Sequence, residues 1–319
     1  MCIRDRYTSA TAQHVVLDGL LMDNYVLVKV QVDRDTAPQV ESAMLEFGAL
    51  SCTFEDAGDK PIHEPAPGHV PLWEKVHVSG MFPQNYDAAL LTSLLQNEIP
   101  KVQEQDIVTE NLQGQVWEKA WMEHFEPQHV GGNFWVVPSF CKPPAEDAVN
   151  LFIDPGLAFG SGTHATTFLC LQWLTKQKLA GKTVIDYGCG SGILAIAAVL
   201  LGAKDVFAFD IDQQALVATD DNATRNGVAD QIQICSSDRE LPGSVDVLVA
   251  NILLTPLLDL KERFAELLKT DGALGVSGVL SEQAAALAGV YASHFQHSAT
   301  EIREQWILYS ARKNGIHQI

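Results

Sequence analysis

The chain has 319 residues, of which 47% are hydrophobic and 19% charged, and its formal net charge is −19. A chain of this length exceeds one ordinary compact core, so two domains are expected. Affinity for nucleic acid comes largely from Lys and Arg that neutralise phosphates, and the acidic balance therefore argues against a broad nucleic-acid-binding surface. The charge suits either encounter with a basic partner or simple solubility, and the sequence leaves both open.

The sequence argues against a membrane protein and against a metal-binding protein. The longest apolar stretch, 193–203, is far shorter than the roughly 20 residues that a membrane-spanning helix requires. Six scattered cysteines without a CxxC pair are typical of reduced thiols. His294 and His297 lie three residues apart on an expected helix, without a third ligand. We therefore expect a soluble, cytoplasmic protein with no membrane segment and no metal site.

The first residues are treated separately from the fold. Residues 1–21 lack the charged, apolar and cleavage-site regions of a secretory signal. A plausible strand begins shortly after Met22. We therefore expect Met22 to be the true start and residues 1–21 to be a non-native extension.

The segment 22–112 predicts the order strand, helix, strand, strand, helix, strand. Thr36 is the expected cap of the first helix, with Gln39 in the capping-box position, and Gly48 ends it. The second helix is expected at 87–97, and the strands at 25–32, 50–55, 76–82 and 102–109. This order is typical of a small ferredoxin-like α+β domain, a class that often binds other macromolecules.

The segment 113–130 is expected to be a linker helix. Trp117, Trp121 and Phe125 are spaced four apart, which places them on one stripe of a helix. Such a stripe most often serves buried packing. A role in clamping the two domains or the substrate is the alternative.

Strands and helices alternate from 131 to 319, which predicts a Rossmann-like, doubly wound α/β sheet. The expected strands are 133–138, 149–153, 183–187, 205–210, 231–235, 245–250, 272–277 and two near 298–311. The expected helices begin near 164 and then span 192–201, 213–226, 257–269 and 281–294. Ligands of such sheets bind at the carboxyl ends of the strands, so the side chains at those ends are the candidates for function.

A glycine-rich turn follows the strand 183–187. Gly188, Gly190 and Gly192 allow a sharp turn and a close approach of a ligand to the backbone. A dinucleotide-binding loop would carry a further glycine at 193, where this chain has Ile193. An ordinary tight strand–helix turn is the alternative to a nucleoside-binding loop.

An aspartate, Asp210, ends the next predicted strand, 22 residues after Gly188. The Asp210 carboxylate is placed to accept both ribose hydroxyls of an adenosine ligand, whereas Asp212 is the expected cap of the next helix. The missing glycine and the acidic chain favour the cationic sulfonium cofactor S-adenosylmethionine over a pyrophosphate. The sequence therefore predicts a class I S-adenosylmethionine-dependent methyltransferase.

Asn251 ends the strand that starts at Val245. A neutral amide can orient an amine N–H, whereas an aspartate there would stabilise the unreactive ammonium. Many enzymes that methylate planar nitrogens continue with two prolines and an aromatic ring, but this chain continues with Ile252, Leu253 and Leu254. An aliphatic amine is therefore the better-fitting acceptor. A turn residue at a strand end is the plain alternative for Asn251.

The motifs at 154–167, at the glycine turn and at 250–253 together resemble the PrmA-type methyltransferases of large-subunit ribosomal protein eleven. The resemblance extends from Met22 to the C-terminus, and the motif at 154–167 is highly specific. The chain departs from the family at Ser161 and Ala165, where Thr and Pro are more frequent. Its glycine-rich stretch 156–164 is interpreted as a lid over the cofactor, with an ordinary surface loop as the alternative.

The resemblance implies the roles of individual residues and domains. Thr167, Gly188, Gly190, Asp210 and Asn251 would bind S-adenosylmethionine, and Asn251 would also be the catalytic residue. The implied substrate is the ribosomal protein, methylated on lysine and α-amino nitrogens, with the N-terminal domain as its recognition domain. We expect a monomer.

Two other functions stay open at this stage. One is a class I methyltransferase for a small molecule or a nucleic acid. The other is a cofactor-binding protein that has lost catalysis and only docks on its partner.

Overall fold

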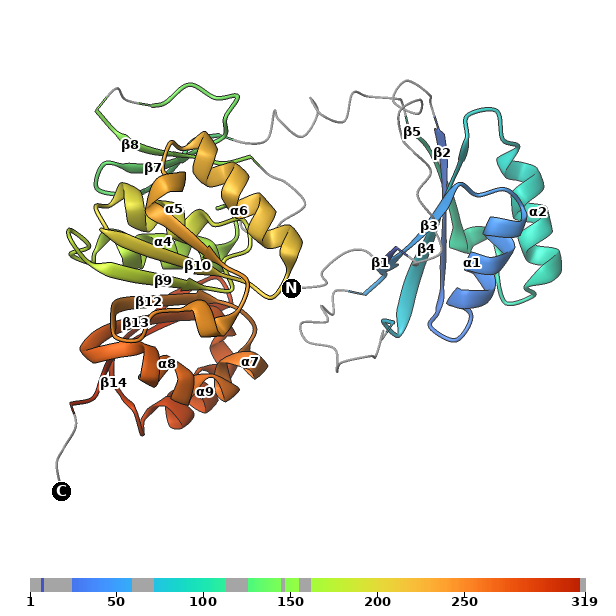
Figure 1. Ribbon diagram of the computed structural model, residues 1–319. Coiled ribbons are helices and arrows are strands. Elements are labelled where there is room, and N and C mark those ends of the chain that lie inside the picture. The colour runs from blue at the N-terminus through green and yellow to red at the C-terminus, as the bar shows by residue number, and fades with distance from the viewer. Residues whose placement is uncertain are drawn as a thin grey trace. The chain divides into compact units, whose positions relative to one another are not determined.

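The structure is a computed structural model that describes residues 7–8, 25–58, 72–112, 126–144, 147–154 and 162–315. The chain divides into two compact units, Met1–His124 and Phe125–Ile319 (Figure 1). Among the described residues, the first unit has one sheet and one buried hydrophobic cluster, and the second unit has two sheets and two such clusters. Residues 113–125 of the predicted linker helix lie outside the described residues.

The first unit is an antiparallel sheet with two helices on one of its faces (Figure 1). Its strand order is β1-β3-β4-β2-β5. The elements are β1 Tyr7–Thr8, β2 Tyr25–Asp33, α1 Ala37–Glu46, β3 Ser51–Asp56, β4 Lys75–Pro83, α2 Ala88–Glu98 and β5 Ile107–Leu112. The six elements from β2 to β5 form the predicted ferredoxin-like fold.

Three details of this unit differ from the sequence prediction. Tyr7–Thr8, which we expected outside the fold, pairs with the edge of β3. Thr36 precedes α1 as predicted, but its side chain makes no capping hydrogen bond. The last strand starts at Ile107 rather than at 102, because the Asp106 carboxylate accepts the Gln103 N–H at 3.0 Å and closes a short 3-10 turn before it.

The second unit is a seven-stranded sheet in the order β11-β10-β9-β12-β13-β15-β14. Its strands are β9 Thr183–Tyr187, β10 Asp205–Phe209, β11 Ile232–Cys235, β12 Val245–Asn251, β13 Leu268–Leu280, β14 Phe295–Arg303 and β15 Trp306–Lys313. All neighbours are parallel except β15, which runs antiparallel to β13 and β14. The chain order reverses between β9 and β12, and this switch point is where such sheets bind ligands.

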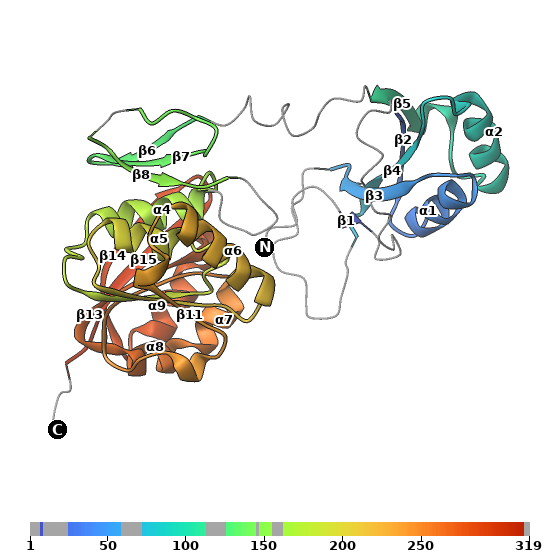
Figure 2. The same cartoon turned by 45° about the horizontal axis from the view of Figure 1, so that its top comes forward.

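Helices cover both faces of this sheet (Figure 2). One face carries α4 Ala165–Thr175, α5 Ile193–Leu200 and α6 Gln213–Arg225, and the other carries α7 Leu254–Asp259, α8 Lys261–Leu267 and α9 Ala284–Tyr291. Two buried clusters fill the two interfaces, and neighbouring strand residues such as Val184 and Ile185 belong to opposite clusters. Burial on both faces explains why the central strands are continuous hydrophobic runs.

A small sheet of β6 Gln128–Gly131, β7 Phe134–Val137 and β8 Val149–Phe152 lies beside α4 (Figure 2). The strands predicted at 133–138 and 149–153 are therefore present, but in a separate sheet. The prediction that the linker helix extends to 130 is wrong, because residues 128–130 pair with β7.

The C-terminal elements differ in extent from the prediction. The helix expected at 257–269 is two short helices, and it starts earlier because Pro256 is accommodated in the first turn of α7. His297 lies on β14 and not on a helix. Within the described ranges, no helix is long and apolar enough to cross a membrane. The same ranges contain no group of three or more residues that could hold a metal ion.

Candidate active site

The predicted site residues gather at the carboxyl edge of three neighbouring strands. Gly188 follows β9, Asp210 follows β10 and Asn251 ends β12. These strands are adjacent in the sheet, with β9 in the middle. The sheet order therefore brings together residues that are up to 63 positions apart in the sequence.

The glycine turn is shaped by close approaches of other side chains. Gly188, Gly190 and Gly192 all have positive φ angles, of 78°, 55° and 77°. A Cβ on Gly192 would lie 2.7 Å from the Thr219 side chain, and one on Gly188 would lie 2.4 Å from Cγ2 of Ile252. Glycine is thus required for the backbone conformation and also for the space that its neighbours occupy.

Helix α6 holds this turn in place. The Thr219 hydroxyl donates to the Gly190 carbonyl at 3.1 Å, and the Asn222 amide donates to the Ser191 carbonyl at 2.9 Å. Sequence reasoning missed both residues. The sequence does mark Thr219, because it is a polar residue on the apolar stripe of the helix between Leu216 and Ala223. In the structure it is fully buried.

Asp210 connects the turn to the next strand. One carboxylate oxygen accepts the Gly190 N–H and the other accepts the Asp212 N–H, each at 3.0 Å. A carboxylate offers about four lone-pair sites, so about two remain for hydroxyl groups of a ligand. Asp212 accepts the Gln214 N–H at 2.9 Å, which confirms its predicted role as the cap of α6.

Ile211 is a further candidate that sequence reasoning missed. Its side chain is 87% exposed, although it lies between Asp210 and Asp212 at the mouth of the site. Single exposed hydrophobic residues are common, but this one offers an apolar surface next to the predicted ribose-binding carboxylate. An isoleucine between two aspartates after a strand was the available signal.

Asn251 is oriented by α4. Its amide nitrogen donates to the Thr167 hydroxyl at 3.2 Å, and Thr167 is fully buried in the first turn of that helix. His164 caps the helix, because its Nδ1 accepts the Thr166 N–H at 3.3 Å. The amide oxygen of Asn251 is buried and has no hydrogen-bond partner among the described residues. A buried acceptor without a donor is costly, so a ligand N–H is its natural partner.

Asp186, the last residue but one of β9, is a second buried acceptor at this site. Burial raises its pKa to about 7, with a further contribution from nearby Asp210, whereas the hydrogen bond from the Ala195 N–H lowers it. That bond, of 2.9 Å, uses one carboxylate oxygen. The other oxygen has no partner within the described part of the chain. A cation or an N–H group of a ligand would stabilise the charged form.

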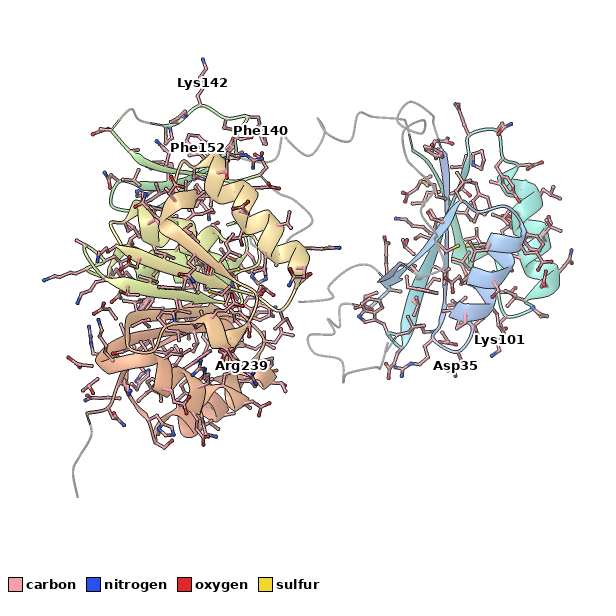
Figure 3. All side chains as sticks on the ribbon, viewed as in Figure 1. Asp35, Lys101, Phe140, Lys142, Phe152 and Arg239 are labelled. Carbon is pink, nitrogen blue, oxygen red and sulfur yellow. The ribbon has the colours of Figure 1, made fainter. Side chains whose placement is uncertain are left out.

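The motif at 154–167 is only partly described, since residues 155–161, and with them most of the predicted lid, lie outside the described ranges. Its first residue, Asp154, accepts the Ser139 N–H at 2.8 Å. The Asn226 side chain accepts the Phe152 N–H and donates to the Phe152 carbonyl, both at 2.7 Å. Phe152, labelled in Figure 3, is the last residue of β8. The end of α6 therefore fixes the strand from which the motif leaves.

These features fit a cationic nucleoside cofactor. Glycines leave room against the backbone at 188 and 192, and Asp210 keeps lone pairs for hydroxyl groups. Asp186 and Asn251 each offer a buried oxygen that has no partner among the residues that the structure describes. The described residues named here are acidic or neutral and include no Lys or Arg, which suits a sulfonium better than a pyrophosphate.

Comparisons with known proteins match the chain to one family. Residues 24–314 match the family described as ribosomal protein L11 methyltransferase (PrmA). The chain is 46% identical to the ribosomal protein L11 methyltransferase of Acinetobacter baumannii (strain AYE), across 91% of this chain and 98% of that protein. It is 47% identical to the protein of the same name from Legionella pneumophila (strain Corby), across 86% and 94% of the two chains.

The chain belongs to the ribosomal protein L11 methyltransferase (PrmA) family. A crystal structure of ribosomal protein L11 methylase from Lactobacillus delbrueckii is similar to it, with a TM-score of 0.56 and 33% identity. That structure is covered completely and corresponds to 60% of this chain. Family membership confirms the class I methyltransferase fold, the protein-methyltransferase activity and the use of S-adenosylmethionine.

The structure brings the five predicted site residues into two contacting groups. Thr167 is bonded to Asn251, and Gly190 is bonded to Asp210. Gly188 links the groups, because its neighbour across the site is Ile252, the residue after Asn251. Their individual roles toward cofactor and substrate stay predictions.

Proposed function

We propose that this chain transfers methyl groups from S-adenosylmethionine to lysine and α-amino nitrogens of ribosomal protein L11. The observation that carries the proposal is the buried amide oxygen of Asn251, which has no partner in the described part of the chain. The bond to Thr167 holds this amide at the carboxyl end of β12. The names of the relatives in Acinetobacter and Legionella support L11 as the substrate.

The cofactor, when bound, supplies an electrophilic methyl group. Asp210 would accept hydrogen bonds from its ribose hydroxyls, and the turn at 188–192 would lie against it. Ile211 would present its exposed apolar side chain to the adenine ring. Asp186, below the turn, would favour the positive charge of the sulfonium through its own negative charge.

Methyl transfer to an amine requires a free lone pair on nitrogen. A lysine with an ordinary pKa of about 10.4 is protonated at neutral pH, and partial burial in the site lowers that pKa by disfavouring the ammonium. Asn251 would accept an N–H of the neutral amine and aim the lone pair at the methyl group. The bound cofactor would supply the methyl group, and solvent would take up the proton that the methylated nitrogen releases. Alignment provides most of the acceleration.

We assign recognition of L11 to the segment 22–112 and catalysis to the segment 131–319. Asp and Glu outnumber Lys and Arg by twelve to four in the described ranges 25–58 and 72–112. Such a surface attracts a basic protein and accelerates its encounter. We further propose that the enzyme acts as a monomer in the cytoplasm.

The proposal is tested by incubating the protein with S-adenosylmethionine and free L11 and recording the intact mass of L11. The expected result is a series of mass increases that correspond to several methyl groups. L11 with chemically acetylated amines is the matched control and should gain none. Unmodified L11 alongside a methylated RNA or metabolite would overturn the proposal.

A further inference from the structure

Gly278 in β13 lies directly against the chain segment that follows Asn251. Its φ angle is +87°, a conformation that disfavours any residue with a Cβ. A Cβ at this position would lie 2.1 Å from the carbonyl oxygen of Ile252, 2.7 Å from its carbonyl carbon and 3.2 Å from its nitrogen. These are backbone atoms, so a rotamer change cannot relieve the overlap and the segment itself would have to move.

Gly278 occupies an irregularity in the sheet. Ser277 is the last residue of β13 that pairs with β12, and its partner is Asn251. The register between β13 and β15 shifts between Ser277 and Val279. The Ser277 hydroxyl donates to the Ile307 carbonyl at 2.7 Å and anchors the buried side of this irregularity. Such irregularities redirect a strand, and this one lies immediately beyond the pair that contains Asn251.

Ile252 is held from two sides by glycines. Its backbone lies against Gly278. Its Cγ2 atom would lie only 2.4 Å from a Cβ on Gly188, so it occupies the space that a side chain there would need. Gly188 belongs to the predicted cofactor-binding turn. The segment after Asn251 is therefore seated between that turn and the irregularity in β13.

We propose that Gly278 is a positioning residue for methyl transfer. By letting the Ile252 backbone approach β13, it sets the direction in which the Asn251 amide oxygen points. The bond from Asn251 to Thr167 is 3.2 Å long, at the upper end of normal geometry, so a small displacement of the segment breaks it. The inference rests on the proposed function to the extent that Asn251 aligns the amine.

Gly227 provides a matched control. It also has a positive φ angle, of +68°, but a Cβ there would meet no atom within 4 Å. Gly227→Ala therefore carries the backbone strain of a left-handed residue without displacing a neighbour. Gly278→Ala has the same backbone strain and also displaces Ile252. A difference in activity or in hydrogen exchange between the two variants therefore reports the displacement of Ile252.

The test compares Gly278→Ala and Gly227→Ala with the unaltered enzyme in three measurements. They are steady-state methylation of L11, binding of S-adenosylhomocysteine by calorimetry, and hydrogen–deuterium exchange of the peptide containing 251–254. For Gly278→Ala we expect kcat to fall by about tenfold or more, because misplaced reacting groups lose alignment. Binding should fall by a smaller factor than kcat, because Asp210, the predicted ribose ligand, follows β10 and not β12. Exchange at 251–254 should rise. Gly227→Ala should leave all three close to the unaltered values.

Unchanged exchange at 251–254 in Gly278→Ala would overturn the inference, as would equal effects of the two variants. Failure of the unaltered enzyme to methylate L11 would instead overturn the proposed function, and the exchange and binding measurements would still decide the role of Gly278.

Should Gly278→Ala not fold, Ile252→Ala and Ile252→Val replace it. Ile252→Ala removes the Cγ2 atom that seats the segment and should lower kcat, whereas Ile252→Val keeps it and should not; equal kcat values in the two would overturn the inference.

Discussion

Buried polar groups at the two ends of the strands in the seven-stranded sheet differ in their hydrogen bonding. We call the side with the amino ends of the parallel strands the amino edge, and the side with their carboxyl ends the carboxyl edge. At the amino edge, Asp246 accepts the Thr183 N–H at 3.0 Å and is paired with Lys182 at 3.2 Å and Lys269 at 3.1 Å. At the carboxyl edge, Asp186 and Asn251 each keep a buried oxygen without a partner in the described ranges. The partners of Asp246 all come from the protein itself and serve stability, whereas Asp186 and Asn251 keep acceptors that a ligand can complete.

The largest expected effect is at the carboxyl edge, with Asp210→Ala. Two hydrogen bonds from hydroxyls to a carboxylate contribute about 1.5–3 kcal/mol each, so cofactor affinity should fall by about 100-fold or more. Calorimetric titration with S-adenosylhomocysteine measures it. Asp212→Ala is the control, because it removes only the cap of α6 and should cost stability but little affinity. Equal affinities of Asp210→Ala and the unaltered enzyme would contradict the ribose assignment.

Asn251→Asp should have the next largest effect and should change the pH dependence. The carboxylate keeps an acceptor of the same shape, but its negative charge raises the pKa of a bound lysine and holds it as ammonium. We expect kcat at neutral pH to fall by about tenfold or more and to recover partly as the pH rises. Asn251→Ala lacks the charge, so its loss of rate should not recover with pH. Parallel pH profiles of the two variants would show that the side chain does not act on the protonation of the amine.

The smallest effect is expected at the amino edge, with Asp246→Ala. Burial alone would raise the pKa of Asp246, but hydrogen bonds from the Thr183 N–H, Lys269 and Lys182 together hold it below its ordinary value. The two lysines are nearly half exposed, so most of the loss comes from the orphaned Thr183 N–H. Urea denaturation at neutral pH should show a loss of about 1–2 kcal/mol, with unchanged methylation.

The pH dependence of that loss follows from the lowered pKa. A carboxyl group with a lowered pKa stabilises the fold fully above its unfolded value and loses this contribution as the pH falls through the folded value. The difference between the unaltered protein and Asp246→Ala should therefore be constant at neutral pH and shrink below about pH 4. A difference that stays constant down to pH 2 would mean that the charge of Asp246 contributes nothing.

The central strands were predictable because their patterns are local. Hydrophobic runs bounded by turn residues located β9 to the residue and β10 to within one residue. The strand β6 was missed because the aromatic residues spaced four apart at 117–125 favour a helix, and nothing in 128–130 marks its end. Pairing with β7, a contact visible only in three dimensions, decides that segment.

The same distinction holds for the site. Gly188, Asp210 and Asn251 could be identified because each directly follows or ends a recognisable strand. Thr219, Asn222 and Gly278 could not, because they act across the sheet or from a neighbouring helix on residues 26 to 31 positions away. Residues that hold a site from a distance carry no spacing signal of their own.

The contacts of helix α6 restrict where the chain can accept an insertion or a deletion. Thr219, Asn222 and Asn226 lie three and four residues apart, on one side of the helix. The first two hold the glycine turn, and the third holds β8. Inserting or deleting one residue between Thr219 and Asn226 would rotate one set of contacts by about 100° relative to the other. The spacing between Thr219 and Asn226 is therefore fixed by these contacts, and we expect insertions and deletions within this span to be disruptive.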